Sequence, residues 1–350
     1  MWVIVLLKRF LIAFCIVIFL PINTFATEIS ASSAIVIDAD TKAVLYEKNA
    51  YCSRSMASTT KIMTALLALE SNRLDDVVKI DAVMLDTEGS SLGLKLNDTI
   101  TLYDLVVGMM LTSGNDSANA VACFLAGGIN EFSKLMNDKA KEIGMNNTTF
   151  VTPSGLDKGK HHSTAYDMAI LTASAIENEA FCNIVSMQSA TITISDKSVT
   201  VYNHNKLLSM DKDIFGVKTG YTEKAGRCLV SAKKYDKNNI ICVTLNAPND
   251  WDDHLNLYKS AEKKYKKYEI SDTIDLAVVG ADRDTVKCSY SSSYLSLTDV
   301  NTKVYCRSFL YAPIKKGDIV GYALVSQNEK IIERLPIEAD EDVEYYGFEE

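Results

Sequence analysis

A serine and a lysine three residues apart stand at the start of a helix-forming run, because Ser58 and Lys61 directly precede residues 62–69. Apolar side chains occur on almost every face of this run, which predicts a buried helix. Residues three apart lie on the same side of a helix, so the Lys61 amine can come within hydrogen-bond distance of the Ser58 hydroxyl. The pair therefore has the composition of a nucleophile beside its base.

The Ser-x-x-Lys pattern is weak support for catalysis when it stands alone. It recurs at residues 209–212, 231–234 and 260–263. Each match has an ordinary alternative, namely a serine at a helix N-terminus followed by a solvated lysine. Further motifs in a consistent arrangement are needed to separate the two interpretations.

A second polar group lies in a short loop between two apolar helical runs. The first run spans residues 102–111, the second begins at Asp116, and Ser113-Gly114-Asn115 lies between them. A loop between two buried helices holds its polar side chains rigidly, as the floor of a cleft requires. The arrangement predicts a cleft at this loop, although Ser-x-Asn is a common string.

A third group follows a strand-like apolar run. Residues 214–217 lead directly into Lys218-Thr219-Gly220-Tyr221. The glycine leaves room for a substrate backbone, and the lysine and threonine supply hydrogen-bond donors. We therefore expect a sheet edge that faces a ligand, and the alternative is a solvated strand end at a turn.

Composition excludes one class of function. The chain has 350 residues, 47% of them hydrophobic, and a net charge of -9. That length can bury a large core and predicts two or three domains. The excess of carboxylates argues against a nucleic-acid-binding protein, because phosphates must be neutralised by a cationic face.

The N-terminus has the order of a secretory signal. Lys8 and Arg9 precede an apolar run over residues 10–20, and small residues follow up to Ala26. We predict a signal peptide over residues 1–26 that is cleaved after Ala26. An uncleaved membrane anchor is the alternative, since residues 2–7 add apolar length. Both interpretations place the rest of the chain outside the cytoplasm.

The cysteines and histidines show no metal-binding spacing. One of the eight cysteines lies in the signal, and the four histidines are scattered, so we expect no metal and no cofactor. Cys228 and Cys242 lie on two strand-like runs that could form a hairpin. They could face each other across it, or both could be buried free thiols.

The order of the predicted elements gives a mixed α/β (α+β) fold in two domains. The runs 34–38 and 43–47 predict a hairpin, residues 190–201 a strand pair, and residues 258–268 a lysine-rich helix with a solvated face. From residue 270 onward the chain consists of short β runs separated by turns. We predict a catalytic domain over residues 27–269 and a small C-terminal β-sandwich over residues 270–350.

In this order, Ser58-x-x-Lys61, Ser113-x-Asn115 and Lys218-Thr219-Gly220 resemble the signature of penicillin-binding proteins and serine β-lactamases. The longer strings 57–65, 111–116 and 216–222 are similar to those of the low-molecular-mass D-alanyl-D-alanine carboxypeptidases. The resemblance extends from about residue 32 to 344. It implies a penicillin-binding-protein-like domain with an antiparallel sheet and a helical cluster.

The resemblance implies a role for each motif residue. Ser58 would attack the carbonyl of the penultimate D-alanine of a peptidoglycan stem peptide, forming an acyl-enzyme. Lys61 would accept the serine proton, which requires a pKa well below its usual value of about 10.4. Ser113 would pass the proton to the leaving amine, and Asn115 would hold Lys61 and the substrate amide. β-Lactam antibiotics would acylate the same serine.

The third motif would bind the substrate. The resemblance implies that Lys218 orients the serine of the second motif and, with Thr219, receives the terminal carboxylate. Gly220 would leave space for the substrate, and the backbone N–H groups of Ser58 and Tyr221 would form the oxyanion hole.

Two features depart from the family pattern. Many relatives carry an arginine between two asparagines to bind the carboxylate, where this chain has Asn203-His204-Asn205. The family often ends in an amphipathic membrane-surface helix, whereas residues 338–350 hold seven acidic and no basic residues. An anionic membrane would repel this tail, so we expect membrane attachment only through an uncleaved N-terminal segment, if at all.

Three other functions share the motifs. A β-lactamase would need a deacylating glutamate, and Glu142 with Asn146 has the required spacing, although Glu142 falls within a predicted helix. A non-catalytic wall-binding protein could have kept the fold. Endopeptidase or transpeptidase activity depends on which nucleophile reaches the acyl-enzyme, and the sequence leaves this open.

Overall fold

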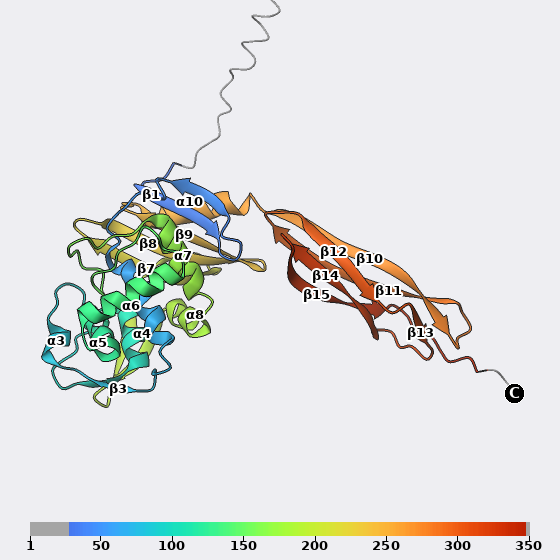
Figure 1. Ribbon diagram of the computed structural model, residues 1–350, viewed down its shortest axis with the longest axis horizontal. Helices are drawn as coiled ribbons and strands as arrows, with labels where there is room; N and C mark the ends of the chain where they lie inside the picture. The colour runs from blue at the N-terminus through green and yellow to red at the C-terminus, as the bar shows by residue number, and fades with distance from the viewer. Residues whose placement is uncertain (1–27, 348–350) are drawn as a thin grey trace, which may run out of the picture.

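The protein forms two structural parts placed end to end (Figure 1). In this computed structural model residues 28–347 are described, and the predicted signal over residues 1–26 lies outside them. The N-terminal part is a mixed sheet-and-helix domain, and the C-terminal part is built of strands. The predicted α+β fold with an all-β C-terminal domain is confirmed.

A five-stranded antiparallel sheet is the frame of the N-terminal domain. Its order is β2 (Val44–Lys48), β1 (Ser33–Asp38), β9 (Asn238–Leu245), β8 (Gly226–Tyr235) and β7 (Ile214–Thr222). The predicted hairpin of β1 and β2 is confirmed. Strand β7 lies at the sheet edge, so it can present one side of its backbone to a ligand.

Both faces of this sheet are covered. Along β1, Ile35 and Ile37 belong to the core on one side, and Ala34 and Val36 to the core on the other. This follows from the two-residue period of a strand and explains why β1 is apolar at consecutive positions. Helix α10 (Asp250–Glu262) covers the second face, where Leu207 of the short helix α9 (Leu207–Met210) also packs, and the other helices gather on the first (Figure 1).

The other helices form a cluster that holds the Ser58 and Ser113 motifs. They are η1 (Ala57–Thr60), α2 (Lys61–Leu69), α3 (Ala82–Leu85), α4 (Leu102–Thr112), α5 (Asn115–Ala126), α6 (Ile129–Glu142), α7 (Ala165–Ala175) and α8 (Glu179–Ser186). Two hairpins complete the domain, β3 (Val77–Lys79) with β4 (Thr99–Thr101) and β5 (Ser189–Ile194) with β6 (Lys197–Tyr202). The predicted strand pair over 190–201 is thereby confirmed.

The C-terminal domain is one six-stranded sheet that encloses its own core. Its order is β12 (Val300–Cys306), β14 (Ile319–Gln327), β15 (Lys330–Ala339), β11 (Thr285–Ser296), β10 (Lys266–Val279) and β13 (Phe309–Tyr311). Strands β11 and β15 pair over only two residue pairs, Cys288 with Ala339 and Ser289 with Glu338. Side chains of β10 and β11 share one apolar cluster with side chains of β14 and β15.

The predicted lysine-rich helix over 258–268 is wrong in its second half. Helix α10 ends at Glu262, and β10 begins at Lys266, which pairs with Ser296 of β11. The predicted domain boundary at 269/270 therefore falls inside β10. Buried Tyr265 lies between the two elements and donates a hydrogen bond of 2.7 Å to the Asp38 carboxylate. This tertiary contact and the strand pairing override the local helix propensity.

Cys228 and Cys242 do not face each other. The register of the β8–β9 hairpin pairs Cys228 with Leu245 and Cys242 with Ser231. Both thiols are free and buried, so the alternative of buried free thiols is the correct one.

Candidate active site

Ser58 and Lys61 lie side by side at the junction of η1 and α2. Ser58 is in the short 3-10 turn, and Lys61 is the first residue of the buried helix α2. The Lys61 Nζ atom is 2.9 Å from Ser58 Oγ. The Lys61 side chain is completely buried. The structure thus brings the predicted nucleophile and base into contact.

The Lys61 amine has two further partners, both of which are carbonyl oxygens. Nζ lies 2.7 Å from Asn115 Oδ1 and 2.7 Å from the backbone oxygen of Ser154. Burial lowers the Lys61 pKa well below its usual value, and Lys218 lowers it further, while Asp116 opposes them. A neutral amine has two N–H groups and one lone pair, and a carbonyl oxygen can only accept. When both N–H groups point at these oxygens, the lone pair faces Ser58.

The Ser113-Gly114-Asn115 loop joins α4 to α5, as predicted. Ser113 ends α4 in the left-handed conformation with a φ of 64°, and Asn115 begins α5. The Asn115 amide nitrogen donates to the Glu88 carbonyl at 2.6 Å, which uses one of its two N–H bonds. The other N–H remains available for a second acceptor.

Strand β7 carries the third motif into the same place. Lys218 is 2% exposed and its Nζ donates to Ser113 Oγ at 3.1 Å. Burial lowers the Lys218 pKa to about 7, so this amine gains and loses its charge near neutral pH. The adjoining Tyr221 is 66% exposed.

Gly220 makes the contact between β7 and η1, the turn that carries Ser58. A Cβ atom at this position would lie 2.9 Å from the backbone nitrogen of Ser58, closer than any ordinary Cβ contact. Only glycine therefore lets the edge strand approach the turn this closely. The approach puts the backbone of β7 beside the backbone of Ser58.

His204 lies between the second and third motifs. Its backbone N–H donates to the carbonyl of Leu111, near the end of α4, at 3.3 Å. Burial lowers the His204 pKa, and Lys218 lowers it further. The imidazole is therefore neutral at neutral pH, which is the property expected to weaken anion binding.

The loop after α6 supplies a site group that sequence reasoning missed. Residues 152–156 run under η1, where Ser154 gives its carbonyl to Lys61 and Pro153 accepts from Thr64 Oγ1 at 2.7 Å. A Cβ atom on Gly155 would lie 1.9 Å from the Ala57 carbonyl oxygen. In the sequence, the string Pro153-Ser154-Gly155 indicates a turn, but it does not indicate that a backbone carbonyl of this turn contacts Lys61.

Asp116 holds another loop that sequence reasoning missed. Its carboxylate accepts hydrogen bonds from Ser91 Oγ and from three successive backbone N–H groups, those of Leu92, Gly93 and Leu94. This loop also carries Glu88, whose carbonyl binds Asn115. Asp116 therefore ties the loop to the start of α5.

Comparison with known proteins identifies the family. A protein-family model described as D-alanyl-D-alanine carboxypeptidase matches residues 21–249. The chain belongs to the D-alanyl-D-alanine carboxypeptidase family. A second model, described as penicillin-binding protein 5, C-terminal domain, matches residues 259–345. The predicted family and its cell-wall hydrolase class are confirmed.

Members of the carboxypeptidase family resemble this chain over most of its length. D-alanyl-D-alanine carboxypeptidase DacF of Bacillus subtilis is 30% identical over 338 residues, which are 91% of this chain and 87% of that protein. A D-alanyl-D-alanine endopeptidase of Escherichia coli is 32% identical over 225 residues, covering 63% of this chain and 72% of the relative. The crystal structure of penicillin-binding protein 5 from Haemophilus influenzae has a TM-score of 0.64 at 26% identity, covering 91% of this chain and 98% of that one.

Glu142, the glutamate that a β-lactamase would use, does not lie beside Ser58 and Lys61. Glu142 pairs with Lys139, which also binds Glu70 just beyond the end of α2. Glu142 therefore lies near the end of α2 that is opposite to Lys61. Helix α2 has nine residues, so its two ends are roughly 13 Å apart at a rise of 1.5 Å per residue. The β-lactamase alternative is therefore not favoured.

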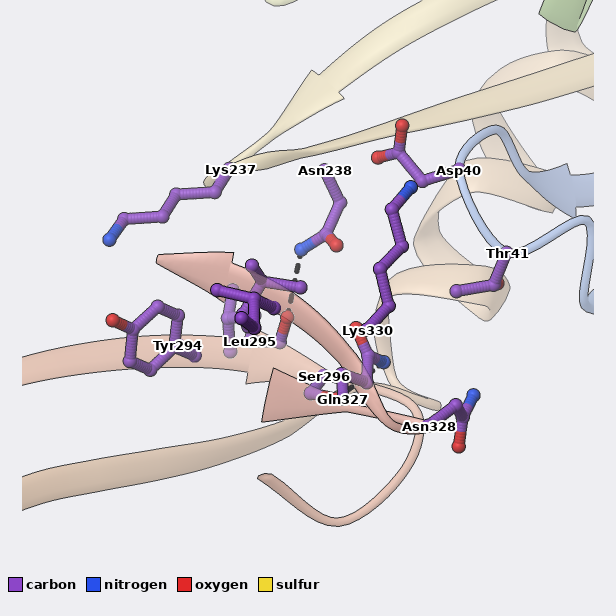
Figure 2. A pocket seen from close by; sticks show the side chains of 12 residues that line it. Asp40, Thr41, Lys237, Asn238, Tyr294, Leu295, Ser296, Gln327, Asn328 and Lys330 are labelled. Carbon is purple, nitrogen blue, oxygen red and sulfur yellow. Dashed lines mark hydrogen bonds between the residues drawn. The ribbon is translucent and has the colours of Figure 1, made fainter. Parts of the chain in front are cut away.

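A cavity of about 500 Å³ lies away from the motif residues, at the junction of the two domains. Figure 2 shows Lys330 extending toward Asp40 there, while Asn238 Nδ2 donates to the Leu295 carbonyl at 2.8 Å. None of its lining residues belongs to the three motifs.

Within residues 28–347, no helix combines the length and apolar character needed to span a membrane.

Proposed function

We propose that this chain is a serine-type carboxypeptidase that removes the terminal D-alanine from peptidoglycan pentapeptide stems through a Ser58 acyl-enzyme. One observation carries the proposal. The Lys61 amine is buried, faces two carbonyl oxygens, and has its remaining position 2.9 Å from Ser58 Oγ. An amine in this setting is a general base ready for the hydroxyl proton.

The acylation step follows from these positions. Ser58 Oγ bonds to the carbonyl carbon of the penultimate D-alanine while its proton passes to the Lys61 lone pair. The bond from that carbon to the terminal D-alanine nitrogen then breaks. The proton moves through the Ser113 hydroxyl to the leaving amine, so D-alanine departs as a neutral amine. Water later cleaves the ester and restores Ser58.

The remaining motif residues bind the substrate. The backbone N–H groups of Ser58 and Tyr221 donate to the developing oxyanion, and the close packing of Gly220 on Ser58 supports this pairing. Lys218 and Thr219 receive the terminal carboxylate. His204 stands where many relatives carry an arginine. Because its imidazole is neutral, it contributes less to carboxylate binding than an arginine would.

The substrate and inhibitors define where the enzyme acts. We propose that it works outside the cytoplasm, on stem peptides ending in D-Ala-D-Ala, and that β-lactam antibiotics acylate Ser58. The similarity to an endopeptidase leaves cleavage of peptide crosslinks as a second activity of the same acyl-enzyme.

The deciding experiment compares wild type with Ser58→Ala. Wild-type protein should release D-alanine from a pentapeptide and bind fluorescent penicillin covalently, and Ser58→Ala should do neither. A crosslinked dimer of stem peptides, supplied in parallel, measures the endopeptidase share. Equal D-alanine release by both proteins would refute the assignment of the nucleophile.

A further inference from the structure

His161 is a buried histidine that contacts Thr60, the residue directly before the proposed base Lys61. It is 3% exposed. The backbone N–H groups of Val151 and Thr152 donate to its Nδ1 atom at 3.0 and 3.4 Å. A ring nitrogen that accepts carries no proton, so the neutral ring carries its proton on Nε2. Nε2 lies 2.9 Å from Thr60 Oγ1 and donates to it.

The Thr60 hydroxyl closes the turn that carries Ser58. Thr60 is completely buried in η1, and its Oγ1 donates to the Ala57 carbonyl at 2.8 Å. Ala57 has a φ of 48°, a left-handed conformation that is uncommon for a residue other than glycine. The hydrogen bond from His161 fixes the Thr60 hydroxyl in the orientation that reaches Ala57.

The other side of the His161 ring holds the loop that supplies a carbonyl to the base. Nδ1 accepts from the first residues of this loop, Val151 and Thr152. Two residues later the Ser154 carbonyl accepts from Lys61 Nζ. A displacement of the loop at its start therefore moves the Ser154 oxygen relative to the amine.

We infer that His161 is a positioning residue for the reaction at Ser58, because its two ring nitrogens join the turn that carries the nucleophile to the loop that directs the Lys61 lone pair. The hydrogen bonds of the His161 ring go to Thr60, Val151 and Thr152 rather than to Ser58 or Lys61, so it acts through Thr60 and the loop. The inference rests on the function proposed above.

The electrostatic surroundings keep the ring in the required form. The His161 pKa is lowered to about 4, mainly by burial; Asp157 opposes this shift, and His162 and Lys224 add to it. The imidazole is therefore neutral near pH 7, and Nδ1 keeps the lone pair that accepts from the loop.

Three variants of the full chain separate the two hydrogen bonds. The His161→Asn amide can keep an acceptor near Nδ1 but loses the donor to Thr60. The His161→Gln amide can keep a donor near Nε2 but loses the acceptor for the loop. Thr60→Val removes the hydroxyl at nearly constant volume. Each is assayed for penicillin acylation and for kcat and KM of D-alanine release, corrected for the folded fraction.

We expect His161→Asn and Thr60→Val each to lower the acylation rate and kcat roughly 10- to 100-fold with little change in KM. The double variant should be no slower than the slower of the two single variants, because both remove the hydrogen bond between His161 and Thr60. His161→Gln should also lower the pH midpoint of acylation, since the Ser154 oxygen no longer stabilises protonated Lys61.

His254→Gln is the matched control. His254 is completely buried in the same domain, and its ring nitrogens lie 2.6 and 2.9 Å from Ser231 and Thr244 hydroxyls. The variant should lose stability but acylate normally once corrected for folding. If the His161 variants do the same, or if the double variant shows additive losses, the inference is wrong. A wild type that neither binds penicillin nor releases D-alanine would overturn the proposed function instead.

Discussion

Replacing Gly220 with alanine should slow acylation of Ser58, the proposed nucleophile, by moving the turn η1 away from β7. The added Cβ atom would lie 2.9 Å from Ser58 N and 3.2 Å from Thr59 N, whereas ordinary contact begins at 3.4 Å. The Ser58 backbone must therefore retreat by about 0.5 Å, the difference between 3.4 and 2.9 Å. Both contacts are to backbone atoms, so no side-chain rotation can relieve them.

This displacement widens the gap between the two proposed oxyanion donors, the N–H groups of Ser58 and Tyr221. A misplacement of 1 Å costs about 100-fold in rate, so half of that distance corresponds to roughly tenfold. Overpacking at such a contact also lowers the free energy of unfolding by about 1–3 kcal/mol. We expect Gly220→Ala to acylate about ten times more slowly and to melt a few degrees earlier than wild type.

The assay is the rate of covalent labelling by fluorescent penicillin under conditions where both proteins are fully folded. Gly128→Ala is the control, because its Cβ would meet only the carboxylate end of Glu131, which can rotate away. Acylation of Gly220→Ala at the wild-type rate would show that this contact does not set the geometry of the oxyanion hole.

Two further predictions concern histidines. His204→Arg should lower KM for a peptide ending in D-Ala-D-Ala several-fold with little change in kcat. The reason is that a permanent cation replaces an imidazole whose pKa is lowered by burial. An unchanged KM would show that His204 does not face the carboxylate. Stability should fall in mild acid, because burial lowers the His254 pKa to about 3 while the unfolded chain protonates it near 6.5. The unfolded state then binds more protons between pH 6.5 and 3, so this site costs about 2 kcal/mol of unfolding free energy between pH 7 and 5. In urea unfolding, His254→Gln should lose about 2 kcal/mol less unfolding free energy than wild type between pH 7 and 5. An equal pH dependence of the two proteins would contradict this prediction.

The elements that carry the motifs were predictable from local pattern. The apolar run after Lys61 forms the buried helix α2, and the loop holding Ser113 and Asn115 lies between two buried helices. Strand β7 lies at the sheet edge with Lys218 pointing at Ser113. Each prediction depended on periodicity or helix-end preference, which act over a few neighbouring residues.

Local pattern failed where distant contacts decide the outcome. Strand β10 begins at Lys266, inside a segment that looks helical, because it pairs with β11. Cys228 and Cys242 lie on adjacent strands but out of register, and a shift of register cannot be read from either strand alone.

The sequence by itself determined the family, the motif residues and the types of the elements that carry them. Tertiary structure alone decided which groups surround the Lys61 amine, because one of them is a backbone carbonyl, at Ser154, which any residue type would supply. It also decided the place of His161 between Thr60 of η1 and the loop that begins at Val151. Side-chain identity is written in the sequence, whereas the neighbours that set a pKa or orient a proton come together only when distant segments pack.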